Sequence, residues 1–160
     1  MFVPKYRILI TNKFFPKDKV ICLGTQLMSI IDSIKGFVPS HIWYGADVEA
    51  VGKGSKKYNL SDIQLNVIGT DSQFIEYCSE IEQFIWGVFL CVDKSFYLQN
   101  IQDVTLEAED EPFRSIGCDG IVIEIRAFDT AFFEIYSEDI ELIKKISKTY
   151  EVEIEVAPSM

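Results

Sequence analysis

Residues 120–136 read GIVIEIRAFDTAFFEIY, and the rest of the predicted fold is built around this stretch. Two runs rich in β-branched and aromatic residues, 120–128 and 131–136, flank the polar pair Asp129 and Thr130. Such runs on either side of a short polar turn are typical of a β-hairpin. An isolated hairpin is marginally stable in water, so other parts of the chain must supply its neighbours in a sheet.

The register of this hairpin follows from the burial of its apolar residues. If the loop has an odd number of residues, Ile125 lies opposite Phe133 and one side of the hairpin is apolar. Glu124 then faces Glu134 on the other side, which we expect to be exposed, with Arg126 one pleat away. A loop with an even number of residues would mix Glu134 into the apolar side, and burial disfavours that arrangement.

Apolar spacing elsewhere in the chain predicts the elements that complete the fold. Leu27, Ile30 and Ile34 recur at helical spacing, and Thr70 followed by Gln73 fits a capping box at a helix start. We expect strands at residues 6–11, 41–51, 63–68, 85–92, 103–108 and 151–156, and helices that begin near Leu23, after Thr70 and after Ser137. The sequence therefore predicts an α+β fold, with a mixed or antiparallel sheet of about six to seven strands and about three helices. The length favours a single domain over residues 1–160.

Charge is distributed unevenly along the chain. Residues 1–60 contain nine Lys and Arg against four Asp and Glu, whereas residues 61–160 contain six against 21. The formal net charge of the whole chain is −10. Such a surface repels phosphate and anionic lipid, and it attracts cationic proteins over long range. We therefore expect a basic protein as partner, and neither nucleic acid nor membrane.

The chain also lacks the apolar segments of secreted and membrane proteins. The N-terminal sequence MFVPKYRILIT contains only a short apolar run, whereas a signal peptide has a longer one after a basic start. The longest apolar stretch, residues 84–92, has about half of the roughly 20 residues that a membrane-spanning helix needs. We expect a cytoplasmic protein.

Neither the cysteines nor the histidine predict a metal or cofactor site. The cysteines are Cys22, Cys78, Cys91 and Cys118. No two of them have the C-x-x-C spacing common in zinc and redox sites, so we expect free thiols without zinc or a disulfide. His41 is the only histidine, and no nucleophile motif accompanies it. The sequence therefore indicates no cofactor.

The strongest candidate site is a run of carboxylates in the second half of the chain. Its members are Glu107, Glu109, Asp110 and Glu111. Their alternation with Leu106 and Ala108 indicates that the acids point outward from a short strand. Together with Glu124 and Glu134, they are the expected contacts for a basic partner.

The overall profile narrows the function to three hypotheses. A small, acidic chain with one histidine and no catalytic motif is similar in composition to bacterial immunity proteins and other stoichiometric inhibitors. This resemblance covers no alignable motif. It implies a non-enzymatic protein that neutralises a basic protein, such as a toxin nuclease domain, by covering its cationic active site. The alternatives are a small enzyme that uses Glu124 and Glu134 as acid and base, and a subunit of a larger complex.

Overall fold

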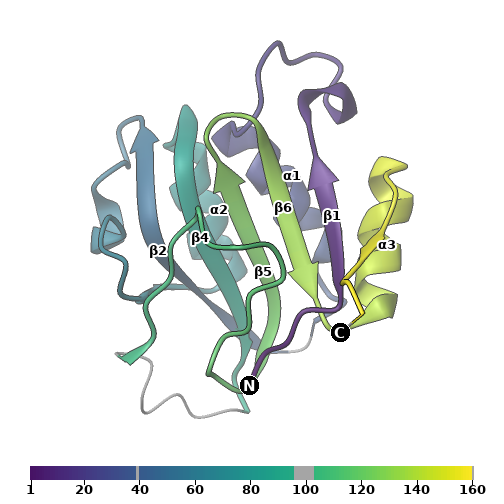
Figure 1. The fold of residues 1–160 in the computed structure, drawn as a ribbon. Helices are drawn as coiled ribbons and strands as arrows, with labels where there is room; N and C mark the ends of the chain where they lie inside the picture. Colours follow the sequence, from purple (N-terminus) through teal and green to yellow (C-terminus); the bar gives the residue numbers. More distant parts are fainter. Residues whose placement is uncertain (39, 96–102, 160) are drawn as a thin grey trace.

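The computed structural model describes residues 1–38, 40–95 and 103–159, which form one seven-stranded antiparallel sheet and three α-helices (Figure 1). The order of strands across the sheet is β3-β2-β4-β5-β6-β1-β7. The strands are β1 (Tyr6–Ile10), β2 (His41–Val51), β3 (Asn66–Gly69), β4 (Gln83–Asp93), β5 (Ile121–Phe128), β6 (Phe132–Ser137) and β7 (Glu155–Val156). The helices are α1 (Gly24–Ile34), α2 (Asp71–Ser79) and α3 (Ile140–Tyr150). The predicted α+β fold is confirmed.

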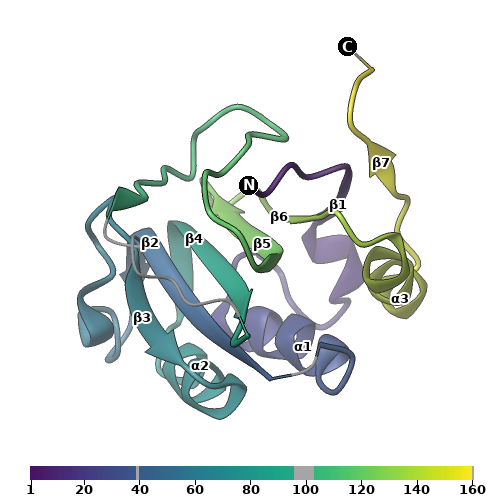
Figure 2. The ribbon, with the colours of Figure 1, turned by 90° about the horizontal axis from the view of Figure 1, so that it is seen from below.

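The three helices lie on one side of the sheet, as the view from below shows (Figure 2). Apolar residues at helical spacing in α1, such as Leu27 and Ile30, share a buried core with Phe89 of β4 and Ile125 of β5. The predicted capping box is present, because the amide of Gln73 donates to the hydroxyl of Thr70 at the start of α2. Among the described residues, no helix combines the length and the apolar character needed to span a membrane.

The hairpin forms as predicted, but its register differs by two residues. Ile125 pairs with Ile135 instead of Phe133, and Arg126 pairs with Glu134. The predicted register would leave a single residue in the loop, which is too short, since the tightest common hairpin loops have two. The observed loop has an odd length, and Asp129 and Thr130 adopt positive φ angles of 47° and 54° in it. Ile125 and Phe133 are both fully buried, so the prediction of one apolar side is confirmed.

The opposite side of the sheet is covered by an irregular segment, residues 103–118, which we call the strap (Figure 1). The predicted strand at residues 103–108 is wrong, because this part of the strap pairs at one isolated bridge, between Thr105 and Gln64. The strap passes over the face of the sheet instead of along its edge. Its backbone therefore does not form a continuous ladder of hydrogen bonds with a neighbouring strand. Its residues Leu106 and Ile116 form a second buried core with Leu90 of β4.

Two smaller predictions about the C-terminal part also need correction. The last strand comprises only Glu155–Val156, because the chain first turns at Glu151, the left-handed residue that ends α3. Helix α3 begins after Asp139, whose carboxylate accepts hydrogen bonds from the amides of Glu141 and Leu142. Ser137, after which the sequence predicts the helix to begin, is instead the last residue of β6.

Candidate functional site

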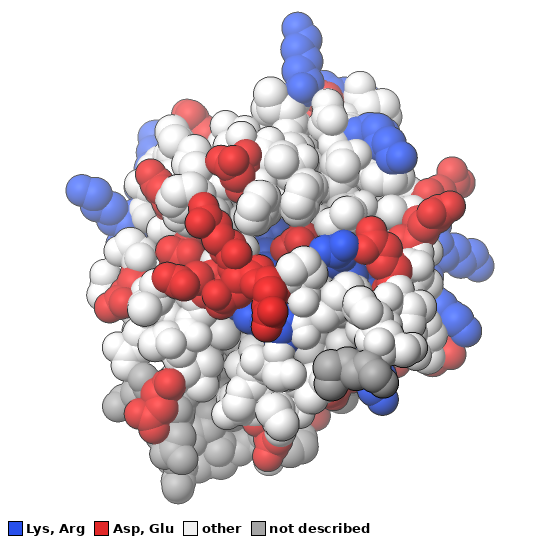
Figure 3. Space-filling model, in the orientation of Figure 1, with Lys and Arg blue, Asp and Glu red and all other residues white. Residues whose placement is uncertain are grey.

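The strap presents a row of carboxylates to solvent. Glu107, Glu109 and Glu111 are exposed, whereas Leu106 and Ala108, which alternate with the first two, are buried. The predicted outward orientation is therefore confirmed for these three acids, although the segment is not a strand, whereas Asp110 is half-buried and pairs with Arg114. Figure 3 shows a band of Asp and Glu across the middle of this face. The band provides a negative surface on a segment that is anchored from below.

The anchor of the strap is a buried guanidinium group from the sheet. Arg126 of β5 is 1% exposed, and its Nη1 donates to the backbone carbonyl of Asp110 at 2.8 Å and to that of Glu111 at 3.2 Å. Its Nη2 also donates to the carbonyl of Glu111, at 3.2 Å. Hydrogen bonds from a charged donor are stronger than neutral ones, particularly when buried. Arg126 therefore fixes the backbone of the two residues that carry neighbouring strap carboxylates.

A second arginine, on the strap itself, completes this attachment. Arg114 donates from Nη2 to Oε2 of Glu124 at 2.6 Å, and Arg126 donates from Nε to the same oxygen at 3.0 Å. Nη1 of Arg114 also donates to a carboxylate oxygen of Asp110 and to the carbonyl of Glu107. Glu124 is thus the buried anion that joins a strap guanidinium to a sheet guanidinium.

The network continues along the sheet to its C-terminal edge. Arg7 of β1 donates from Nη1 to Oε1 of Glu134 at 3.3 Å and from Nε to Oε2 of Glu155 at 2.9 Å. Nη1 of Arg126 lies 3.7 Å from Oε2 of Glu134, and its guanidinium lies 4.6 Å above the ring of Tyr136. We call these ionic groups of the sheet and strap the charge cluster: Arg7, Asp110, Arg114, Glu124, Arg126, Glu134 and Glu155.

Burial dominates the electrostatics of Glu134. Loss of contact with water raises the pKa of this carboxyl above its ordinary value, because the charged form is penalised. The charge of Arg126, a hydrogen bond with the Tyr136 side chain and the charge of Arg7 act in the opposite direction, but they do not cancel the effect of burial. The negative charge of Glu124 contributes to the increase. Glu134 is therefore the carboxyl of the charge cluster whose pKa is raised by burial.

The prediction that Glu124 and Glu134 form an exposed pair is wrong. Glu124 is 0% exposed and Glu134 is 5% exposed, and Arg126 is the residue directly opposite Glu134. The alternation in β5 and β6 correctly separated the polar side from the apolar side, but it could not reveal that the strap covers the polar side. Both carboxylates are engaged with guanidinium groups beneath the strap, so neither can contact a docked partner directly.

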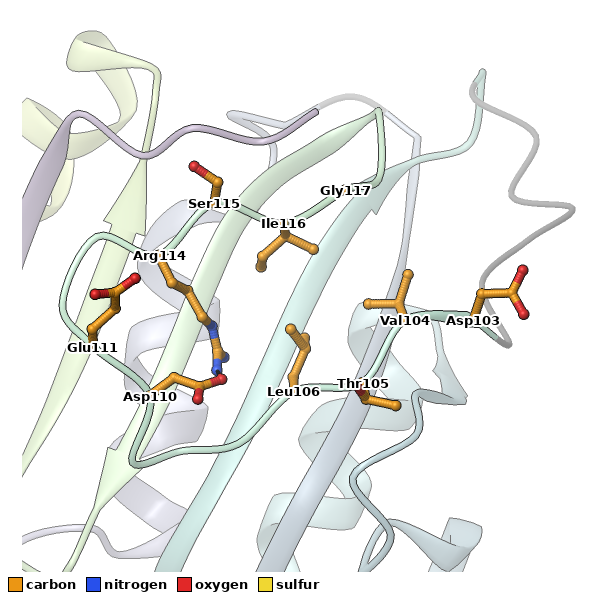
Figure 4. Close-up of a pocket in the computed structure, with 10 residues that line it drawn as sticks. All are labelled: Asp103, Val104, Thr105, Leu106, Asp110, Glu111, Arg114, Ser115, Ile116 and Gly117. Atoms are coloured by element: carbon orange, nitrogen blue, oxygen red, sulfur yellow. Dashed lines mark hydrogen bonds and ion pairs between the residues drawn. The ribbon is translucent and has the colours of Figure 1, made fainter.

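A cavity of about 540 Å³ opens between the outgoing and returning arms of the strap (Figure 4). Leu106 and Ile116 point toward each other from the two arms, and Arg114 points toward Asp110. The lining thus combines an apolar floor with ionised groups of both signs. Such a recess can accept a side chain that has an apolar stem and a polar end.

His41 has a structural partner that the sequence did not reveal. Its Nε2 lies 2.6 Å from Oδ1 of Asp71, the first residue of α2, and Nε1 of Trp43 donates to the same oxygen at 2.7 Å. The signal was the alternation of His41 and Trp43 on one side of a strand, but the position of Asp71 depends on tertiary packing. These contacts join β2 to the start of α2.

The cysteines are free thiols in poorly reactive surroundings. Cys22, Cys78 and Cys91 are buried, and Cys118 is partly buried. Burial raises the pKa of Cys22 to about 12 and also raises the pKa of Cys78 and Cys91, which disfavours the reactive thiolate. Within residues 1–38, 40–95 and 103–159, no group of three or more His, Cys, Asp or Glu residues could hold a metal ion.

No known protein family, curated protein or solved structure matches the chain. The strap, the charge cluster and the cavity are therefore the features that bear on function.

Proposed function

We propose that the protein binds a basic protein through the strap and inhibits it by covering a cationic site. The observation that carries this proposal is the strap: its carboxylates project into solvent while buried Arg126 holds their backbone in place. The proposed contacts are Glu107, Glu109, Asp110 and Glu111. A toxin nuclease domain is the kind of partner we envisage, because nucleases present positive clefts to phosphate. We place this interaction in the cytoplasm.

The physical basis is electrostatic steering by a rigid acidic surface. Complementary charges accelerate association and select the correct orientation, whereas they add less to the final affinity. A surface that is already ordered before docking also loses less conformational entropy on binding. The carboxylates on the strap meet both requirements, since they are numerous and their backbone is fixed from below.

The cavity between the arms supports the same proposal with a different type of contact. Binding energy at protein interfaces concentrates in a few side chains that fill pockets, and arginine is among the most frequent of them. An arginine of the partner can place its stem against Leu106 and Ile116 and its guanidinium near the carboxylates of Asp110 and Glu111. The proposed interface therefore has an anchoring recess within a steering surface.

The experiment compares two variants of equal charge. The first changes Glu107, Glu109 and Glu111 to Gln; Asp110 is spared because it pairs with Arg114. The control changes three exposed acids on the helix side, Glu76, Glu82 and Glu141, to Gln. A partner is captured from the native host at low salt with each protein, identified by mass spectrometry and purified, and the association rate is then measured. We expect the first variant to associate about tenfold more slowly or worse, and the control to resemble the wild type.

Two further measurements separate docking at the strap from general attraction. Wild-type association should slow steeply as salt rises from about 0.05 to 0.5 M, because the Debye length contracts. Gly117→Leu adds a side chain to the cavity wall without a change of charge, and a Cβ at Gly117 meets no atom within 4 Å. We expect this substitution to accelerate dissociation. Equal association of both triple variants, with no dependence on salt, would exclude the strap as the docking surface.

A further inference from the structure

The charge cluster contains most of the unsatisfied buried polar atoms in the described part of the chain. Four buried side-chain atoms there have no hydrogen-bond partner: Oη of Tyr77, Nε of Arg114, Oε1 of Glu124 and Oε2 of Glu134. Three of them belong to the charge cluster, beneath or within the strap. Native proteins leave few such atoms, and each usually marks strain, function or a missing partner. Their concentration under one segment indicates that the interface between sheet and strap is not fully satisfied.

The ionic composition of the charge cluster explains part of this deficit. Three guanidinium groups face four carboxylates, so one negative charge is in excess when all are ionised. An uncompensated charge is costly away from water, and a buried acid can avoid that cost by taking up a proton. Uptake of one proton would therefore neutralise the excess negative charge of the charge cluster.

Glu134 is the carboxylate best placed to take that proton. Glu124 accepts hydrogen bonds from two guanidinium groups, and the side chains of Asp110 and Glu155 are 38% and 42% exposed. Glu134 is almost completely buried. Its Oε1 accepts one guanidinium hydrogen bond, from Arg7 at 3.3 Å, and its Oε2 has no hydrogen-bond donor. Burial also raises its pKa, as described above.

The ionisable groups that act directly on Glu134 are Glu124 and Arg126 of β5, Arg7 of β1 and Tyr136 of β6. The other members of the charge cluster are linked to Glu134 through these groups: Glu155 of β7 pairs with Arg7, Arg114 of the strap pairs with Glu124, and Asp110 pairs with Arg114. The pKa of Tyr136 is raised by burial, so this phenol stays neutral in the mildly acidic range. The arginines remain charged throughout that range.

Arg126 connects the charge on Glu134 to the strap. Its Nη1 donates to the carbonyls of Asp110 and Glu111 and also lies 3.7 Å from Oε2 of Glu134. An ionised Glu134 therefore competes with the strap for the same guanidinium nitrogen. A neutral Glu134 ends that competition and removes the repulsion between Glu134 and Glu124.

We propose that, as the pH falls, Glu134 takes up one proton from solvent before an exposed glutamate does, and that the neutral acid holds the strap more firmly to the sheet. The proton adds to Oε2, which changes from an acceptor without a partner to a donor. No other bond is made or broken. The strap thus has a proton-dependent attachment, which concerns the protein alone and does not depend on the proposed partner.

The sign of the effect follows from linkage. We call the strap closed when it is attached to the sheet and open when it is detached. The closed strap holds Glu134 in the environment that raises its pKa, whereas the open strap exposes Glu134 to water. The closed form therefore binds more protons than the open form. The attachment is therefore strengthened below the pKa of the closed form and weakened as the pH rises through it. We therefore expect the firmest attachment on the acidic side of the Glu134 titration.

The test measures the titration and the strap in the same sample of the full chain. Carbon-13 NMR follows the Glu134 carboxyl, and hydrogen exchange, corrected for its intrinsic pH dependence, follows the strap amides. Good reporters are the amides of Leu106 and Ile116, which donate to the carbonyls of Ile63 and Phe2. Protection of these amides should rise as the pH falls through the midpoint of Glu134, and that midpoint should lie above that of an exposed glutamate. Each pKa unit between closed and open forms changes the opening equilibrium about tenfold.

A matched pair of variants isolates Glu134. Glu134→Gln is neutral at every pH, so the strap should stay well protected and lose its dependence on pH in this range. Glu76→Gln removes an exposed carboxylate of α2, outside the charge cluster, and it should keep that dependence. The proposal is overturned if wild-type Glu134 titrates like an exposed glutamate, or if strap protection ignores its titration. The wild-type measurement decides the question alone if Glu134→Gln does not fold.

Discussion

The two faces of the sheet are both covered, but by layers of different chemistry. On the helix side, α1, α2 and α3 bury apolar side chains such as Phe74, Phe89 and Phe133 in the larger core. On the strap side, a smaller apolar core borders the charge cluster, in which Glu124 and Arg126 are as inaccessible to water as the phenylalanines. The apolar contacts of the helix side are nondirectional, whereas the charge cluster on the strap side depends on specific pairing of hydrogen-bond donors and acceptors.

This difference determines how each layer responds to change. An apolar core loses free energy in proportion to the area and volume removed, and neighbouring side chains partly compensate. A buried ionic layer responds abruptly, because removal of one partner leaves the other charged and unpaired. The helix side therefore provides the bulk of the stability, and the strap side fixes the position of a specific segment.

The largest expected effect is on the helix side. Phe133 is fully buried between β6 and the helices, so Phe133→Ala should reduce the free energy of unfolding by about 3–5 kcal/mol. Chemical denaturation monitored by circular dichroism measures this change. The control is Phe37→Ala, since Phe37 is 40% exposed and should cost much less. A cost for Phe133→Ala below about 1 kcal/mol, the range of surface substitutions, would show that this face is not the main core.

A somewhat smaller loss is expected when the charge cluster loses its central anion. Glu124→Gln retains the shape of the side chain but leaves Arg114 and Arg126 without their shared carboxylate. Removal of one partner from a buried ion pair costs about 3–5 kcal/mol, and we expect the lower end of this range because the Gln oxygen still accepts hydrogen bonds. Unlike the loss at Phe133, this one should be concentrated in the strap, and hydrogen exchange of the strap amides should show it.

A double variant sharpens that comparison. Glu124→Leu combined with Arg126→Met replaces a buried pair by apolar side chains, an exchange that is often neutral or stabilising. We expect the double variant to recover part of the stability lost by Glu124→Leu alone, while the strap stays poorly protected because Arg126 no longer binds its carbonyls. Additive losses in the two single variants would mean that the residues do not act as a unit.

The sequence predicted the helix side well because its information is local. Helical spacing places three apolar residues on one face of α1, and all three are buried: Leu27, Ile30 and Ile34. The hairpin, with Ile125 and Phe133 on its apolar side, follows from alternation alone. The register was two residues off, since alternation fixes the parity of the loop and turn geometry fixes its length.

The strap side could not be predicted in the same way, because its order depends on contacts between distant parts of the chain. The alternation around Leu106 and Ala108 gave the correct inward and outward faces, but a strand and a strap have the same pattern. Glu134 is paired with Arg7, which is distant in the sequence, and Glu124 is paired with Arg114, which belongs to the strap. Neither pairing can be inferred from the alternation within β5 and β6. Two glutamates on a polar face, with one arginine between them, read as an exposed pair until the covering segment is known.

The smallest expected effect concerns the outer surface of the strap. Changing Glu107, Glu109 and Glu111 to Gln removes three exposed charges but no interaction that anchors the strap, since the hydrogen bonds at Glu107 and Glu111 use their backbone carbonyls. Surface substitutions of this kind usually alter the free energy of unfolding by no more than about 0.5 kcal/mol.

We expect the midpoint of denaturation and the exchange of the strap amides to match those of the wild type. A small gain in stability is compatible with this view, because the three acids repel one another and their neighbour Asp110. A large loss, comparable to that of Glu124→Gln, would mean that the outer carboxylates hold the strap in place. The distinction between an outer acidic surface and an inner ionic anchor would then have to be abandoned.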